Sequence, residues 1–434
     1  MSAKTITKQV YLKKLEETLN EWKSFGAVST PHRIVELMIE LADLKRQKNL
    51  DILEPACGFC NFLIGIYLRY PQNNFYGVEI NDEVYKKIKE LFKDTPFKLI
   101  KTDFLLWKTT KKFDLIIGNP PYGIIGDGSH YPIHTLKRKK EEYKKTFNTW
   151  FGKYNIYGAF IEKSISLLKS GGKLVFIIPA TWMILDEFKR LRKFLSYLGK
   201  VKVYYLGSNV FNGVSVSVCI LIFEKGRKGA ELYIRNDQSY NFIRTTTLTD
   251  WNGDILRFET EATKKLETKG TCLGKIFEIK ISARSPEIKN FDGIANKKNK
   301  GMMPFMNGRN IQKGFIDRNN YTNLWLKKEK VVKLKSFYAI VPRIVVGHTK
   351  GGKIVAAIEE EIYPYVGDVY HLLPKITFSK RELKEIVDWL NSEELNRYME
   401  TLYKDITPHT TATQLKMVPL HKKFNTNLGT LFEL

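Results

Sequence analysis

Residues 74–92 read NFYGVEINDEVYKKIKELF, an apolar strand pattern over 74–79 followed at once by a helical pattern over 82–92. The same order precedes this stretch, with a strand pattern at 50–53 and an apolar helical pattern from about Asn61. Further strand patterns occur at 98–100, 113–118 and 173–178, and a helical pattern near 160–168 precedes the last of them. Strands separated by helices predict a parallel, Rossmann-like α/β sheet with helices on both faces.

The pattern changes in the second half of the chain. Apolar runs near 201–205 and 215–223 complete the predicted sheet, and residues 224–229 are polar and Gly-rich. From about residue 250 the strand and helix alternation is lost, and the chain becomes basic with isolated aromatic residues. A chain of 434 residues is too long for one ordinary core. The sequence therefore predicts an α/β domain over residues 1–245 and a mixed α+β domain over residues 246–434.

Composition limits the class of protein. The chain is 43% hydrophobic and 27% charged, and no apolar run approaches the roughly 18 residues that a membrane span requires. Residues 11–19 have the pattern of an amphipathic helix. These features predict a cytoplasmic protein that does not associate with membranes. The formal net charge of +25 favours a nucleic-acid partner. A Lys-rich surface that reflects thermophilic or AT-biased composition would explain this charge as well.

The four cysteines do not form a recognisable scaffold. Cys57 and Cys60 have the CxxC spacing of some zinc and redox sites, but a zinc site needs a second pair of ligands. Cys219 and Cys272 stand alone. We therefore expect reduced, structural thiols and no bound metal.

Acidic residues follow three of the predicted strands. Glu54 comes after the first strand, Glu79 ends the second, and Asp103 follows the third with Phe104 beside it. In a doubly wound sheet these positions surround the ligand site. A carboxylate after the second strand can bind both hydroxyls of a ribose, and an acid and a ring after the third can bind an adenine. Each acid alone could be a solvated strand cap, but three in this order indicate a nucleoside site.

The turn after the first strand lacks the GxGxxG pattern that binds a pyrophosphate at a helix N-terminus. S-Adenosylmethionine is a nucleoside without phosphate, and its ammonium group would be a suitable partner for Glu54. We therefore expect S-adenosylmethionine rather than a dinucleotide as the cofactor.

Asn119-Pro120-Pro121-Tyr122 directly follows the fourth strand pattern. Asn and Pro often end strands in ordinary turns, so the tetrapeptide by itself leaves a simple turn open. Its position at the fourth strand end, facing the predicted cofactor, favours a catalytic role.

The stretch Asp114 to Tyr122 resembles the motif of amino-group methyltransferases. The wider chain resembles the γ-class adenine-N6 DNA methyltransferases, in particular the Taq-type enzymes that modify TCGA. The matching stretches span nearly the whole chain: 30–31, 53–57, 103–107, 118–123, 157–160, 179–182, 283–287, 308–310, 348–351 and 408–409. The resemblance implies a methyltransferase sheet in the first domain and a DNA-recognition domain in the second.

The chemistry of adenine explains such a motif. The N6 lone pair is delocalised into the ring and is a poor nucleophile. If the Asn119 side-chain carbonyl and the Pro120 backbone carbonyl each accept an N6 hydrogen bond, the nitrogen shifts toward sp³ geometry. The Tyr122 face can stabilise the positive charge that develops, by a cation–π interaction worth about 1–2 kcal/mol. The target adenine must be flipped out of the duplex to reach this site.

The resemblance also implies roles for other residues. Phe211 would stack on the flipped base opposite Tyr122, although the sequence alone leaves a core aromatic open. The cofactor pocket would be lined by Val28, Thr30, Glu54, Ala56, Glu79, Ile80, Asp103, Phe104, Pro121 and Phe160. The segment 58–60 differs from the Taq-type pattern, which could change the cofactor affinity. The segment 209–214 also differs, which leaves the orientation of Phe211 open.

In the second domain, Arg284 and Ser285 lie in a matched segment and are expected to contact DNA, Arg284 by a bidentate bond to guanine. A phosphate contact or a structural ion pair would suit Arg284 equally. Pro408 falls where the family places a residue that fills the space left by the flipped base. These matches imply double-stranded DNA as substrate, TCGA as target, and membership of a type II restriction-modification system.

Two other functions remain open from the sequence. A methyltransferase for an RNA base or for a protein glutamine could use the same tetrapeptide, but the basic, aromatic-rich second domain disfavours it. A non-catalytic DNA-binding protein would be expected to lose Asn119 or Tyr122. We expect a monomer, and a cognate restriction endonuclease, if one exists, would act separately.

Overall fold

The computed structural model describes residues 30–44, 48–126, 133–211, 216–236, 240–268, 270–348 and 353–421. The predicted helix at 11–19 and the predicted site residue Val28 lie outside them. Contacts divide the chain into a first unit, residues 1–258, and a second unit, residues 259–434. The division falls after Phe258 rather than at residue 245.

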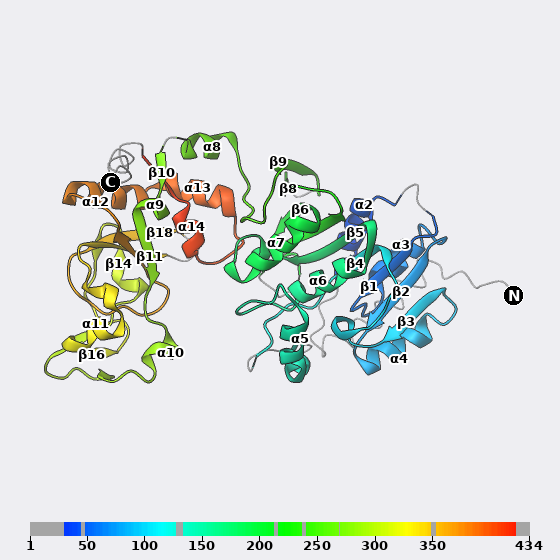
Figure 1. Ribbon diagram of the computed structural model, residues 1–434, viewed down its shortest axis with the longest axis horizontal. Coiled ribbons are helices and arrows are strands. Elements are labelled where there is room, and N and C mark those ends of the chain that lie inside the picture. The colour runs from blue at the N-terminus through cyan, green and yellow to red at the C-terminus, as the bar shows by residue number, and fades with distance from the viewer. Residues whose placement is uncertain are drawn as a thin grey trace. The chain divides into compact units, whose positions relative to one another are not determined.

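In the described part of the first unit, one sheet of nine strands has the order β3-β2-β1-β4-β5-β7-β6-β8-β9 (Figure 1). Neighbours from β3 to β5 pair in parallel, while β7 is antiparallel to both β5 and β6. The strands are β1 Asp51–Pro55, β2 Asn74–Glu79, β3 Phe97–Lys101, β4 Phe113–Gly118, β5 Leu168–Pro179, β6 Gly199–Gly207, β7 Val218–Lys225, β8 Ala230–Arg235 and β9 Phe242–Leu248. The predicted α/β architecture is confirmed.

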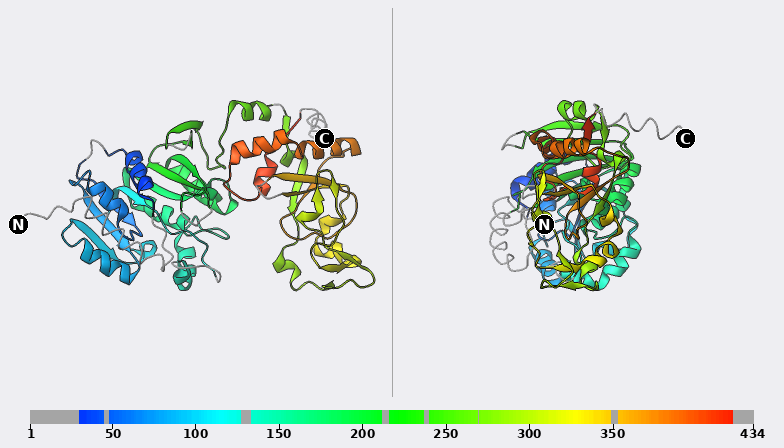
Figure 2. Two further views of the ribbon diagram at one scale, coloured as in Figure 1. Left: turned by 180° about the vertical axis from the view of Figure 1, so that it is seen from behind. Right: turned by 90° about the vertical axis from the view of Figure 1, so that its left-hand side faces the viewer.

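Helices cover both faces of this sheet (Figures 1 and 2). The helices α2 (His32–Ala42), α3 (Asn61–Tyr67) and α4 (Asp82–Leu91) bury their apolar side chains in one cluster with alternate residues of β1, β4 and β5, such as Ile52, Leu115 and Val175. Helices α6 (Tyr157–Leu167) and α7 (Lys189–Leu198) follow β4 and β5 in the chain and contact β5 and β6. Because successive side chains of a strand point to opposite faces of the sheet, the helices on each face pack against an apolar surface. The result is a three-layer arrangement with two apolar interfaces.

Local chemistry explains where α4 begins, which matters because its first residues border the predicted cofactor site. The Asn81 side chain accepts hydrogen bonds from the backbone N–H groups of Glu83 and Val84, at 3.0 and 3.1 Å. Acidic residues lie in the first turn and Lys89 lies in the last, as the helix dipole favours. The helix therefore begins directly after the carboxyl end of β2.

Strands β8 and β9 extend the sheet beyond the predicted elements. β8 pairs in parallel with β6, and β9 pairs antiparallel with β8. Trp251, Leu256 and Phe258 are buried, and the backbone N–H of Leu256 donates to Met183 O at 3.0 Å. These contacts carry the chain past residue 245 within the first unit and explain the later division.

The second unit is mixed α+β, as predicted. Its described part contains a four-stranded antiparallel sheet of order β11-β19-β17-β18 and three smaller sheets. The larger sheet consists of β11 Phe277–Ile281, β19 Tyr370–Pro374, β17 Arg343–His348 and β18 Ile354–Glu359. The smaller sheets consist of β10 Gly270–Cys272, β20 Pro419–His421, β12 Ile294–Ala295, β16 Trp325–Lys327, β13 Met302–Pro304, β14 Ile311–Gln312 and β15 Phe315–Ile316. Its helices are α8 Glu261–Glu267, α9 Leu273–Ile276, α10 Ser285–Ile288, α11 Val331–Leu334, α12 Lys380–Leu390, α13 Glu393–Tyr403 and α14 Ala412–Lys416.

Among the described residues, no helix is long and apolar enough to cross a membrane.

Candidate active site

The order of the sheet reverses at β1, which pairs in parallel with β2 on one side and β4 on the other. Ligands of open α/β sheets bind outside the carboxyl ends of the strands at such a reversal. Glu54 is the penultimate residue of β1, Glu79 ends β2, and Asn119 follows β4 directly. The structure thus brings three of the predicted site residues to one edge of the sheet.

The turn between β1 and α3 is tied to the end of β2. The backbone N–H of Gly58 donates to Glu79 Oε2 at 3.0 Å, and that of Asn81 donates to Glu79 Oε1 at 2.7 Å. Glu54 Oε2 accepts from the backbone N–H of Leu63 at 3.1 Å, within the first turn of α3. Both carboxylates therefore accept hydrogen bonds from backbone N–H groups, Glu79 from the adjoining loops and Glu54 from the first turn of α3.

The backbone of this turn is strained. Ala56 and Cys60 adopt left-handed φ angles of 52° and 60°, and Gly58 between them has a φ of 48°. A left-handed conformation costs about 1–3 kcal/mol for a residue with a side chain. Such strain persists where the surrounding structure enforces it, most often at ligand sites. The predicted pocket residue Ala56 thus lies at a strained position in the loop that borders the site.

The paired thiols in this turn are structural in character. Cys57 and Cys60 are buried, and their pKa values are raised, for Cys57 by a hydrogen bond with Cys60 and for Cys60 by burial. Both thiols are thus held in their neutral form, which binds metals poorly. In the described part of the chain no group of three His, Cys, Asp or Glu could hold a metal ion.

The two glutamates are buried with exposed fractions of 3% and 7%. Burial raises the pKa of Glu54 well above its usual value, and the nearby charge of Glu79 raises it further. Burial also raises the pKa of Glu79, although backbone hydrogen bonds oppose the shift. A ligand with a positive charge or with hydroxyl donors would stabilise the ionised form of these two buried carboxyl groups.

Asp103 has partners that the sequence did not reveal. Its Oδ2 accepts from Lys139 Nζ at 2.9 Å and from the Tyr143 hydroxyl at 2.7 Å, while its Oδ1 accepts from the backbone N–H of Leu105 at 3.0 Å. Lys139 and Tyr143 come from the helical segments η3 (Ile133–Lys139) and α5 (Lys140–Thr146). They are separated from Asp103 by 36 and 40 residues, so no local pattern could link them to it.

The aromatic part of the predicted cofactor pocket is assembled. The rings of Phe104 and Phe160 stack at 5.3 Å between centroids with an interplanar angle of 26°. Both side chains are buried, while Ile80 is 38% exposed and Pro121 is half-buried. Phe104 follows Asp103 directly, so the acid and the ring pair form one side of the site.

Asn119 carries the most informative contact. Its Nδ2 donates to the Thr30 hydroxyl at 3.0 Å, while its buried Oδ1 has no hydrogen-bond partner among the residues that the structure describes. Nearly all buried polar atoms in proteins are hydrogen-bonded, and leaving one unpaired costs about 1–3 kcal/mol. With the amide nitrogen bonded to Thr30, Oδ1 is left to accept from a donor that arrives with a ligand.

Replacing Thr30 with Val removes the acceptor that orients the Asn119 amide while keeping the shape of the side chain. We expect the methyl-transfer step to slow about tenfold, the value of one hydrogen bond. Thr30→Ser should retain the rate because it keeps the hydroxyl. Single-turnover rates at saturating cofactor measure this step, and an equal slowing in both variants would show that the hydroxyl has no orienting role.

Tyr122 is anchored by its hydroxyl, which donates to Ile177 O at 2.8 Å. Burial raises the pKa of Tyr122 well above its usual value, so the hydroxyl stays protonated. Its ring contacts Tyr157 and Phe211 edge to face, both at 6.3 Å between centroids. The ring face, rather than the hydroxyl, is therefore the part of Tyr122 suited to a substrate.

The contact between Tyr122 and Phe211 differs from the predicted sandwich. Their planes are inclined by 68°, and Phe211 is buried in the core cluster with an exposed fraction of 3%. A planar base between two rings requires them to be parallel and about 7 Å apart, since stacked atoms sit about 3.5 Å apart. The two rings are neighbours as expected, but Phe211 would have to turn before a base could lie between them.

The predicted DNA contacts of the second unit lie on its surface. Arg284, Ser285 and Pro408 are all exposed. Arg284 Nη2 forms an ion pair with Asp368 Oδ1 at 2.9 Å, the kind of contact left open from the sequence. Both side chains are about half exposed, so this pair contributes little to stability and can open for another partner.

Comparison with known proteins identifies the family of the chain. Residues 64–211 match the model of the Eco57I restriction-modification methylase family, and residues 303–420 match the TaqI-like C-terminal specificity domain. The type II methyltransferase M.TthHB8I of Thermus thermophilus is 43% identical over 412 residues, which cover 93% of this chain and 93% of the relative. The type II methyltransferase M.HincII of Haemophilus influenzae is 33% identical over 224 residues, covering 51% of this chain and 41% of that protein.

A solved structure supports the fold. The type ISP restriction-modification enzyme LlaGI, determined with a DNA substrate mimic, aligns with a TM-score of 0.53 at 15% identity. The alignment covers 85% of this chain and 51% of that chain. The sequence identity over nearly the whole length and the two family matches show that this chain belongs to the type II DNA methyltransferases of restriction-modification systems.

Proposed function

We propose that this enzyme methylates the N6 amino group of adenine in double-stranded DNA, using S-adenosylmethionine. The observation that carries the proposal is the buried, unpartnered Asn119 Oδ1 at the carboxyl end of β4. An exocyclic amino group is a donor of the kind that this acceptor lacks. Pro120 follows it, and a proline offers a backbone carbonyl without an N–H that could compete.

The residues around the site fit the cofactor. The buried carboxyl groups of Glu54 and Glu79 suit an ammonium group and a ribose diol, and the stack of Phe104 on Phe160 offers an apolar surface for an adenine. Asp103, held by Lys139 and Tyr143, is positioned to accept from the adenine amino group. When bound, S-adenosylmethionine supplies an electrophilic methyl group on a sulfonium.

The chain's own residues prepare the target nitrogen. Asn119 Oδ1 and the Pro120 carbonyl accept the two N6 hydrogens and draw the lone pair out of conjugation with the ring. The Tyr122 ring face stabilises the positive charge that develops on the base. A strong general base is unnecessary, because the N6 proton becomes acidic only after the nitrogen has been alkylated.

The target adenine must leave the base stack, because the site lies within a folded domain that a stacked base cannot enter. We propose TCGA as the recognition sequence and assign Phe211 to the opposite face of the flipped base. Arg284, Ser285 and Pro408 would contact the DNA from the second unit. The family match of residues 303–420 to a specificity domain supports a DNA-reading role for this unit.

The proposal is tested by methyl transfer from labelled S-adenosylmethionine to duplexes. Label should enter duplexes that contain TCGA, be recovered as N6-methyladenine, and protect the site from a TCGA-cutting endonuclease. A matched duplex with TCGA changed to TGCA is the control. Recovery of the label in cytosine, in RNA or only in protein would refute the proposal.

The buried glutamates predict a pH dependence of cofactor binding. Glu54 has a raised pKa in the free protein, so it retains its proton to higher pH than an exposed glutamate. This shift stabilises the free fold below the ordinary glutamate pKa, and that contribution is lost as pH rises through the raised value. A cationic ligand favours the ionised form, so binding should release a proton and tighten as pH rises toward that value.

Calorimetry in buffers of different ionisation enthalpy measures the released proton directly. The glutamine side chain of Glu54→Gln cannot ionise. This variant should therefore bind S-adenosylmethionine more weakly and release fewer protons on binding. Equal proton release by the wild type and Glu54→Gln would contradict the role given to Glu54.

A further inference from the structure

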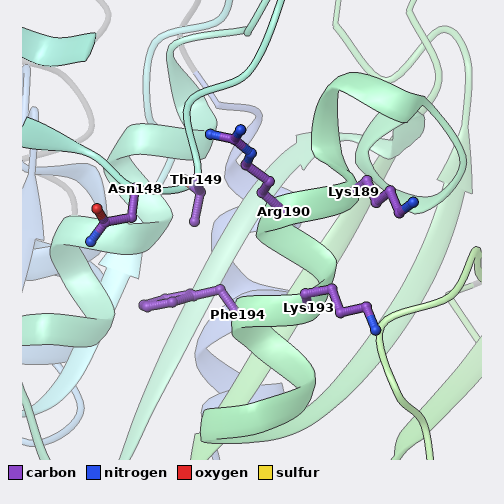
Figure 3. Close-up of a pocket in the computed structure, with 6 residues that line it drawn as sticks. All are labelled: Asn148, Thr149, Lys189, Arg190, Lys193 and Phe194. Atoms are coloured by element: carbon purple, nitrogen blue, oxygen red, sulfur yellow. The ribbon is translucent and has the colours of Figure 1, made fainter. Parts of the chain in front are cut away.

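Helix α7 carries a hollow with basic lining residues that is not part of the proposed catalytic centre. The hollow has a volume of about 430 Å³ and is lined by Lys189, Arg190, Lys193 and Phe194 of α7, with Asn148 and Thr149 opposite (Figure 3). Lys189 and Lys193 extend to one side of the helix, and Arg190 and Phe194 extend toward the other. Three basic residues of α7 thus contribute to the lining of one depression on the surface of the first unit, with their charged groups on two sides of the helix.

Within the described part of the chain, the basic residues that line this hollow form no ion pair, although Asp186 and Glu187 lie shortly before them in the chain. Neither Lys189 nor Lys193 forms an ion pair there, and both are exposed. Arg190 lies over the Phe151 ring at 5.0 Å and donates to Trp150 O at 3.4 Å, so it too has no carboxylate partner. Three unpaired like charges on neighbouring turns repel one another, which favours an anionic partner.

The Glu162 carboxylate, which holds the 148–149 turn, is occupied by other donors. Glu162 accepts from the backbone N–H groups of Asn148 and Thr149 at 3.0 and 2.9 Å, and from the Thr149 hydroxyl at 2.6 Å. Glu162 is buried, so it fixes the 148–149 turn from within. Arg192, on the buried side of α7, donates to Trp182 O and Leu185 O instead. The exposed side of α7 is therefore built as a cationic surface on a rigid support.

The hollow lies close to the catalytic tetrapeptide. The Tyr122 ring contacts Tyr157 at 6.3 Å, and Tyr157 stacks on Phe188 at 5.0 Å with an angle of 17°. Phe188 directly precedes Lys189, so the first turn of α7 is two ring contacts away from Tyr122. Successive phosphates of one DNA strand are spaced by about 3.4 Å along the helix axis. A phosphate within a few nucleotides of a base held at Tyr122 is therefore the candidate partner for the first turn of α7.

We propose that this hollow binds a backbone phosphodiester of the target strand, close to the flipped adenine. The inference rests on the proposed function, since it requires DNA to be present at Tyr122. Such a contact carries no sequence information, but it adds affinity and sets the position of the strand relative to the site. Through this phosphate contact the first unit would bind the target strand itself, in addition to any contact made by the second unit.

The test is a salt titration of DNA binding by the full chain. Lys189→Gln combined with Lys193→Gln removes two charges from the hollow. The control, Lys87→Gln with Lys89→Gln, removes two charges from α4, which packs against β2 and β3 at the other end of the sheet. The slope of log K against log salt should fall in magnitude by about 1 to 2 in the first variant, since each lost phosphate contact contributes about 0.9. The control should keep the wild-type slope.

A second measurement identifies the contact itself. Duplexes with a single neutral methylphosphonate at each position near the target adenine are compared for binding. In the wild type, one or two positions should weaken binding, and the same positions should have no effect in the Lys189/Lys193 variant. Equal slopes in all proteins, or equal methylphosphonate effects in wild type and variant, would overturn the inference. These binding readouts need no methyl transfer, so they remain distinct from a failure to methylate adenine.

Discussion

Asn119→Ala is expected to lower kcat/KM by about 10²- to 10³-fold, the usual effect of losing one preorganised hydrogen bond at a reacting group. The variant loses the buried acceptor Oδ1, while Glu54, Glu79 and Asp103 keep their contacts. The affinity for S-adenosylmethionine should therefore change only a few-fold. Single-turnover methyl transfer and cofactor titration separate the two quantities. A large loss of cofactor affinity with an unchanged rate would assign Asn119 to cofactor binding instead.

For Asn119→Ala we also predict the effect on thermal stability. Because Oδ1 has no partner among the described residues, its removal relieves a desolvation cost that offsets the loss of the hydrogen bond from Nδ2 to Thr30, so the melting temperature should change little. Tyr122→Phe is a suitable companion, since it keeps the ring face and loses only the bond to Ile177 O. It should retain most of the activity. A strongly destabilised Asn119→Ala protein would show that Oδ1 has a structural partner.

Glu359→Ala is expected to destabilise the second unit by about 3–5 kcal/mol, the typical effect of removing one partner from a buried ion pair. Glu359 is fully buried in β18 and accepts two hydrogen bonds from Arg318, at 2.8 and 2.7 Å. The Tyr365 hydroxyl and the backbone N–H of Glu361 also donate to it, at 2.6 and 2.9 Å. Removing it leaves the fully buried Tyr365 hydroxyl without this acceptor and Arg318, which is 32% exposed, without its carboxylate partner.

Urea unfolding of the full chain measures this effect, with Glu360→Ala as the control. Glu360 is the next residue and forms only an exposed pair with Lys380 at 3.0 Å, so its loss should cost less than about 1 kcal/mol. Similar losses in the two variants would refute the view that the Glu359 cluster supports this unit.

The contacts of Glu359 also make the stability of the second unit depend on pH in the acid range. Burial opposes ionisation of Glu359, but hydrogen bonds from Arg318 and Tyr365 outweigh it and lower the pKa. A lowered folded pKa gives stability that is present above the ordinary glutamate value and is lost as pH falls through the folded value. The difference in unfolding free energy between wild type and Glu359→Ala should therefore shrink below about pH 4.

The sequence alone determined the architecture and the identity of the polar residues at the strand ends. Strand and helix periodicity depends on neighbouring residues, so the strands from β1 to β7 and the helices α3, α4 and α6 were all predictable within a few residues. The position of Glu54, Glu79 and Asn119 at one edge follows from the rule that parallel strands end on the same side. Strands β8 and β9 were missed, because their pairing with β6 is long-range.

Only the tertiary structure decided how these residues are held. Thr30 and Asn119 are 89 residues apart, yet their hydrogen bond leaves Oδ1 without a partner. Lys139 and Tyr143 reach Asp103 from a separate segment, and the inclined contact of Phe211 with Tyr122 depends on packing that no local pattern encodes. Hydrogen bonds and ring contacts act over a few ångströms in space, whereas sequence periodicity reports only on neighbours along the chain. The residue types could therefore be read from the sequence, and their orientations could not.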